Sequence, residues 1–85
     1  MAHSIKYVDG ARKNIAALPQ AMRKRIVRSI EKLADTPRPD GCKKLKGSDT
    51  YRIRVGDYRV VYEIHDDVLV ILVVKIGHRS DVYRG

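Results

Sequence analysis

One stretch, residues 51–62, constrains this chain more than any other part of it. Its apolar and polar residues alternate with a period of two, and the pair Gly56-Asp57 interrupts the alternation. This pattern predicts a β-hairpin whose loop has two residues. The pairs expected across that hairpin are Val55 with Tyr58, Arg54 with Arg59, and Arg52 with Val61.

The expected hairpin gathers three arginines on one face. Successive side chains of a strand point to opposite faces, whereas partners on neighbouring strands share a face. Arg52, Arg54 and Arg59 therefore lie together, and the apolar and tyrosine side chains cover the other face. Like charges opposite each other destabilise a hairpin unless an anion lies among them, and the planar fork of arginine fits phosphate oxygens. We expect an exposed, phosphate-binding surface here.

Length and charge narrow the class of protein and of partner. A chain of 85 residues makes one domain, residues 1–85, and its formal charge of +8 favours nucleic acid or an acidic protein as a partner. The single cysteine, Cys42, excludes an internal disulfide and fits a reducing cytoplasm. Neither an export signal nor a membrane-spanning segment is expected, because the most apolar run, residues 68–76, is too short to cross a bilayer.

The order of elements predicts an α+β fold. A first strand is expected over residues 3–8, followed by a helix that Asp9 caps and that ends near Leu18-Pro19. A clearer apolar stripe predicts a second helix over residues 20–34, and residues 35–41 form a loop rich in proline, aspartate and glycine.

The second half of the chain supplies the remaining strands. A short basic run, residues 43–47, leads into the hairpin, and a turn at Asp66-Asp67 precedes a strand of largely β-branched residues from Val68 to Val74. That run is typical of a strand with both faces largely covered. The expected architecture is β-α-α-β-β-β, with two helices on one face of a mostly antiparallel sheet.

Few residues are suited to acid–base chemistry. The three histidines are scattered and Cys42 has no partner at ligand spacing, so no metal or other cofactor is expected. Glu63 belongs to the arginine face, where a charge partner for a neighbouring arginine is favoured over a general base. The tail, residues 77–83, combines histidine, arginine and tyrosine, which suit proton exchange, phosphate binding and base stacking. A solvated tail whose tyrosine covers the core is the alternative.

Several segments, in their order and spacing, resemble the RelE/ParE superfamily of bacterial and archaeal toxins, and its RelE branch in particular. The resemblance covers almost the whole chain. The segments that carry it are Lys44-Leu45-Lys46-Gly47, Tyr51-Arg52-Ile53-Arg54, Asp57-Tyr58-Arg59-Val60-Val61-Tyr62, Ile76-Gly77-His78-Arg79 and Val82-Tyr83.

This resemblance implies a ribosome-dependent mRNA interferase. Such toxins enter the ribosomal A site and cut the exposed codon without a metal ion: the ribose 2′-OH attacks the adjacent phosphorus, leaving a 2′,3′-cyclic phosphate and a 5′-OH. It also implies a cognate acidic antitoxin, similar to RelB, that wraps the basic surface in a toxin–antitoxin hetero-oligomer.

The resemblance also implies roles for individual residues. Arg52 and Arg54 match basic residues of the RelE active face, often lysines there, and guanidinium groups cannot abstract a proton. Arg59 matches a phosphate-contacting arginine. The remaining candidates are Arg79 for the leaving oxygen or the cyclising phosphate, Tyr83 or His78 for the 2′-OH proton, and Lys44 and Lys46 for phosphate binding.

Two other functions stay open from the sequence. The ParE branch shares the fold but inhibits DNA gyrase, and its members generally lack the clustered basic residues and the C-terminal tyrosine. A non-catalytic RNA-binding module would use the same arginines only to hold phosphate.

Overall fold

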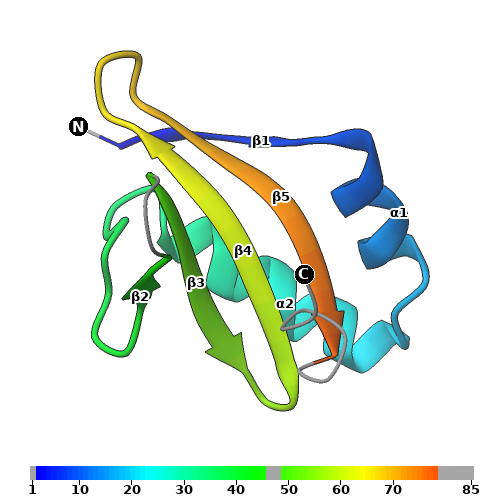
Figure 1. Cartoon of the computed structure of the whole chain (residues 1–85). Helices are drawn as coiled ribbons and strands as arrows, with labels where there is room; N and C mark the ends of the chain where they lie inside the picture. Colours follow the sequence, from blue (N-terminus) through cyan, green and yellow to red (C-terminus); the bar gives the residue numbers. More distant parts are fainter. Residues whose placement is uncertain (1, 46–48, 79–85) are drawn as a thin grey trace.

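The computed structural model describes residues 2–45 and 49–78, which form two helices and a five-stranded sheet. Figure 1 shows the helices on one side of the curved sheet. The elements, in chain order, are β1 (Ser4–Tyr7), α1 (Asp9–Ala16), α2 (Gln20–Lys32), β2 (Lys43–Lys44), β3 (Thr50–Val55), β4 (Tyr58–His65) and β5 (Val70–His78).

The strands lie in the order β1-β5-β4-β3-β2. β1 pairs with β5 in parallel, and every other neighbouring pair is antiparallel. The predicted α+β class and mostly antiparallel sheet are therefore confirmed. The prediction lacked β2, because a strand of two residues is too short for an alternating pattern to be visible.

The hairpin of β3 and β4 has the predicted register. Val55 lies opposite Tyr58, Arg54 opposite Arg59, and Arg52 opposite Val61. Gly56 opens the loop with a φ of +62°, in the left-handed region that glycine adopts most readily. The two-residue turn thus closes as the Gly-Asp pair indicates, and it fixes which side chains of both strands share a face.

Apolar side chains of the sheet and helices form one core. Tyr62, Ile71 and Val73 from the sheet are fully buried, as are Ile26 and Ile30 from α2. The rings of Tyr51 and Tyr62 stack, with centroids 6.1 Å apart. The core therefore occupies the helix-covered face of the sheet, as the alternation predicts.

Both helices begin or end a little differently from the prediction. Val8 is the N-cap of α1, and no side chain caps this end, so Asp9 is the first helical residue rather than the cap. Its carboxylate still lies in the first turn, where the helix dipole favours negative charge. α2 ends at Lys32, and the two residues expected to continue it, Leu33 and Ala34, form a turn.

The strand β5 starts later than predicted, because the turn after Asp66 takes up two more residues. Val68 is 63% exposed, and Leu69 has a φ of +53°. The register with β4 shifts between Val61 and Tyr62, which is a local β-bulge. Side chains of β5 are buried on one face and mostly half-buried or exposed on the other, so the second face is covered less than expected. Neither helix within the described residues has the length and apolarity needed to cross a membrane.

Candidate active site

The three hairpin arginines lie on the face of the sheet opposite the helices. Arg52 and Arg54 come from β3 and Arg59 from β4, and the register places Arg54 directly across from Arg59. Together they line a hollow of about 240 Å³. We call it the arginine hollow, and its lining residues are Gly41, Lys43, Arg52, Ile53, Arg54 and Arg59. The predicted clustering of the three guanidinium groups agrees with this geometry.

The three arginines differ in exposure, which the sequence did not predict. Arg54 is exposed and Arg52 half-buried, but Arg59 is only 3% exposed. The prediction of an exposed surface therefore holds for Arg54 and in part for Arg52, but not for Arg59. Arg59 lies on the inner strand β4, between Arg54 on β3 and Gly77 on β5. Its Nη1 donates a hydrogen bond of 3.5 Å to the carbonyl of Tyr58.

Burial of Arg59 affects how strongly the arginine hollow can bind an anion. A charge that is shielded from water interacts more strongly with an opposite charge, because the effective dielectric constant is lower. Arg59 still lines the hollow, so an anion placed there would lie beside a fixed, largely dehydrated guanidinium. The more exposed Arg54 can adjust its position to the ligand.

A fourth cation in the hollow, Lys43, was missed by the sequence analysis. The register of β2 with β3 places Lys43 opposite Arg52, and Lys44 opposite Tyr51. Because partners share a face, Lys43 belongs to the arginine face and the neighbouring Lys44 to the other. Lys44 was predicted to bind phosphate, but this register separates it from the arginines. The basic run predicts positive charge here, and only the strand pairing shows which lysine lies in the hollow.

The loop between α2 and β2 is held to the sheet by polar contacts. The Tyr62 hydroxyl donates a hydrogen bond of 2.7 Å to the carbonyl of Pro37. Arg38 donates from Nε to the Tyr51 hydroxyl at 3.2 Å, and its guanidinium carbon lies 5.2 Å from the centroid of that ring. Arg38 also forms an ion pair of 3.1 Å with Asp66. These contacts fix the path of the chain toward Gly41 and Lys43, which line the hollow.

The contacts of this loop perturb two ionisable groups. Burial raises the pKa of Tyr62, so its hydroxyl keeps the proton that it donates to the loop. Hydrogen bonds from Arg38 and then from His3, whose Nε2 lies 3.1 Å from the carboxylate, lower the pKa of Asp66. Tyr62 therefore keeps its proton and Asp66 stays charged, and these are the protonation states that the loop contacts require.

Within residues 2–45 and 49–78, the ion pair recorded for Glu63 is with a histidine. Its carboxylate lies 2.8 Å from Nε2 of His65, two residues along the same strand. Arg52 is the diagonal neighbour of Glu63 on the same face, because Thr50 lies opposite Glu63 and Arg52 lies opposite Val61. The pairing of Glu63 with a neighbouring arginine therefore stays a prediction, beside the observed contact with His65.

The candidates for proton transfer are placed only in part. His78 lies opposite Tyr58 on the helix-covered face, and their rings make an edge-to-face contact with centroids 5.7 Å apart. Arg59 and Gly77 form the next pair, on the other face. The structure therefore does not bring His78 together with the arginines. Three other candidates, Lys46, Arg79 and Tyr83, lie outside the described residues.

Comparison with known proteins settles the family. Residues 5–83 match the family model described as the ParE toxin of the type II toxin–antitoxin system parDE. A protein of Escherichia coli K12 named mRNA interferase toxin RelE is 30% identical, over 98% of this chain and 92% of its own length. This chain belongs to the RelE/ParE toxin family.

Solved structures of RelE toxins share the fold. The archaeal RelE–RelB complex of Pyrococcus horikoshii OT3 contains a chain that matches with a TM-score of 0.85 and 31% identity, over 95% of this chain and 99% of that one. The isolated Escherichia coli RelE toxin matches with a TM-score of 0.81 and 29% identity, over 96% of this chain and 92% of that one.

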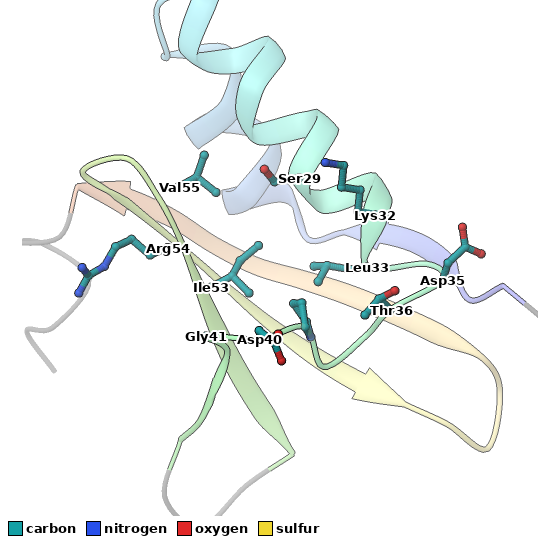
Figure 2. A pocket seen from close by; sticks show the side chains of 11 residues that line it. Ser29, Lys32, Leu33, Asp35, Thr36, Asp40, Gly41, Ile53, Arg54 and Val55 are labelled. Carbon is teal, nitrogen blue, oxygen red and sulfur yellow. The ribbon is translucent and has the colours of Figure 1, made fainter.

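A second hollow of this RelE/ParE-family toxin lies on the other side of β3. It has a volume of about 510 Å³ and is formed by the C-terminal half of α2, the loop that follows and the helix-covered side of β3. Figure 2 shows Leu33, Ile53 and Val55 along it, while the side chain of Arg54 points away. The strand β3 therefore separates a largely apolar groove from the cationic arginine hollow.

The described part of the toxin offers no cluster of three or more histidine, cysteine or acidic side chains that could hold a metal ion. Cys42 is half-buried against the core rather than in the arginine hollow. What the hollow can do chemically is hold an oxyanion with several cationic donors, a role for which guanidinium and ammonium groups are well suited.

Proposed function

We propose that this toxin is an mRNA endonuclease that cuts the codon in the ribosomal A site and so stops translation. The observation that carries the proposal is the arginine hollow, which gathers Lys43, Arg52, Arg54 and Arg59 on the open face of the sheet. The name of the Escherichia coli relative, mRNA interferase toxin RelE, gives independent support.

In the proposed reaction the arginine hollow receives the scissile phosphate. The ribose 2′-oxygen bonds to phosphorus, the bond to the 5′-oxygen breaks, and the products are a 2′,3′-cyclic phosphate and a 5′-OH. Negative charge grows on the phosphate oxygens during this step, and preorganised donors stabilise such charge by about 3 kcal/mol each. Arg52, Arg54 and Arg59 would supply these donors without a metal ion.

The 2′-OH proton needs an acceptor. Tyr83 is favoured over His78, because His78 lies on the other face of the sheet from the arginines. Nearby cations would lower the pKa of a tyrosine hydroxyl placed among them. Arg79 would stabilise charge on the reacting phosphate. A site with so few acid–base groups depends on orientation of the substrate, which the ribosome would provide.

The proposed partner is an acidic antitoxin similar to RelB, encoded beside the toxin and acting with it in the cytoplasm. Several similar structures are complexes of RelE with RelB. A formal charge of +8 suits an acidic segment that covers the arginine hollow and competes with RNA. Binding would form a hetero-oligomer in which the toxin is inactive.

The decisive experiment is induced expression with and without the adjacent open reading frame, followed by mapping of mRNA ends. The proposal predicts growth arrest that the neighbouring gene relieves, with cuts inside translated codons. Purified toxin should cut mRNA on programmed ribosomes. Intact mRNA in arrested cells would refute the proposal.

The second candidate function is inhibition of DNA gyrase, which the ParE name of the matching family model favours. A supercoiling assay with purified gyrase separates the two functions, because only a gyrase inhibitor would block supercoiling at toxin concentrations that leave mRNA intact. A toxin that bound RNA in a salt-sensitive manner without cutting it would instead be a binding module.

A further inference from the structure

The arginine hollow needs a group that can release a proton. When the bond between phosphorus and the 5′-oxygen breaks, that oxygen carries negative charge and must gain a proton to leave as a hydroxyl. A positioned proton donor typically accelerates such a step by about 10²–10⁴-fold. The three arginines are unsuited to this role, because a guanidinium group in a protein keeps its protons.

Lys43 is the one residue lining the arginine hollow, as the structure describes it, whose side chain can both bind an anion and give up a proton. Gly41 and Ile53 have no ionisable group, and the other lining residues are arginines. An ammonium group is a compact charge with three donors on a flexible stem, so it can follow a reacting oxygen.

The position of Lys43 is set by the sheet. It lies on the edge strand β2, directly opposite Arg52, and its side chain is exposed. Arg54 and Arg59 line the hollow from β3 and β4. A phosphate held by the arginines would therefore have the ammonium group at the β2 side of the hollow, in contact with solvent that can restore its proton.

We propose that Lys43 is the general acid of the cleavage reaction. As the 2′-oxygen bonds to phosphorus and the bond to the 5′-oxygen breaks, a proton passes from Nζ of Lys43 to that 5′-oxygen. The 2′-OH proton passes to the separate acceptor proposed above, and the neutral amine regains a proton from water. This inference rests on the proposed endonuclease function and assigns one residue within it.

A substrate with sulfur in place of the scissile 5′-oxygen tests the assignment, because a thiolate leaves without being protonated. Programmed ribosomes carrying normal or 5′-thio mRNA would be incubated with wild-type toxin, Lys43→Ala and Lys43→Arg. The matched control is Lys24→Ala, which removes an exposed lysine on α2, on the helix-covered side of the sheet. Circular dichroism melting would verify that each variant is folded.

We expect Lys43→Ala to cut normal mRNA about 10²-fold more slowly or worse, and to cut 5′-thio mRNA within a few-fold of wild type. Lys43→Arg should show the same pattern, because it restores the charge but cannot transfer a proton. Lys24→Ala should match wild type on both substrates.

Two results would overturn the assignment while leaving the endonuclease proposal intact. If Lys43→Arg cuts normal mRNA within tenfold of wild type, Lys43 acts through its charge alone. If Lys43→Ala is equally impaired on both substrates, the lysine positions the phosphate and is not the proton donor. Wild-type toxin that cuts neither substrate would instead refute the proposed function itself.

Discussion

The two faces of the sheet differ in what their side chains do. On the helix-covered face, Tyr62, Ile71 and Val73 are fully buried, in the same core as Ile26 and Ile30 of α2. On the open face, the Arg54 side chain is exposed, whereas Arg59 is a buried, charged residue. Adjacent residues of one strand, such as Arg59 and Val60, thus belong to different functions, one to the proposed site and one to the core.

This difference shows how a short chain can hold a cluster of like charges. Repulsion among the arginines destabilises the folded state, and burial of apolar side chains on the opposite face offsets it. The backbone hydrogen bonds of the sheet position both the arginine side chains and the apolar side chains. Substitutions on the helix-covered face should therefore lower stability, whereas substitutions on the open face should lower activity.

Arg59 should give the largest effect on activity. Arg59→Ala is expected to slow mRNA cleavage about 10²–10³-fold, because a preorganised donor to the scissile phosphate is lost. The measurement is the cleavage rate on programmed ribosomes. Arg59→Lys is the control for the side-chain volume that Arg59→Ala removes from a buried position. It keeps a long cationic side chain, so it should cut mRNA faster than Arg59→Ala. A folded Arg59→Ala toxin that cuts at the wild-type rate would contradict the assignment of the arginine hollow.

Ile71 tests the other face. Ile71 is fully buried in the core, so Ile71→Ala should lower the free energy of unfolding by roughly 3 kcal/mol through lost burial and the cavity left behind. Guanidinium denaturation measures this change. The cleavage rate per folded molecule should stay within a few-fold of wild type. A large loss of activity in fully folded protein would show that the two faces are not separable.

The sequence predicted the helix-covered face better than the open one. Alternation and a Gly-Asp turn are local, so they define the register of β3 with β4, and that register divides the side chains between faces. The two helices were also predicted, with errors of one or two residues at their ends. The apolar stripe shows that a helix is present, but it does not determine the residue at which the backbone leaves the helical conformation.

The arginine hollow depends on contacts between distant parts of the chain, which a local pattern does not contain. The pairing of β2 with β3 decides that Lys43 rather than Lys44 joins the arginines. The burial of Arg59 follows from its place on an inner strand. The position of His78 follows from the register of β5, which includes a bulge.

Tyr62 tests whether the loop contacts support the site. Tyr62→Phe removes the hydroxyl that bonds the carbonyl of Pro37, and we expect a loss of about 1 kcal/mol in the free energy of unfolding. The ring still fills the core, so the effect should be smaller than that of Ile71→Ala. Thermal melting measures it. An unchanged melting temperature would show that the loop is held by its other contacts.

The smallest effect is expected at Asp66, whose side chain is exposed. Hydrogen bonds from Arg38 and His3 lower the pKa of Asp66 in the folded toxin. The stability that these bonds provide is therefore fully present above the pKa of the unfolded chain, about 3.9, and it is lost as the pH falls through the lower pKa of the folded toxin. Asp66→Asn should therefore lower the melting temperature by about 1–3 °C at pH 7, and the difference from wild type should shrink below pH 4. Asp67→Asn, at the exposed neighbouring position, is the matched control. If the difference in melting temperature between wild type and Asp66→Asn persisted unchanged at pH 2.5, Asp66 would stabilise the turn through its shape rather than its charge. The ion pair with Arg38 would then contribute nothing to holding the loop against the sheet.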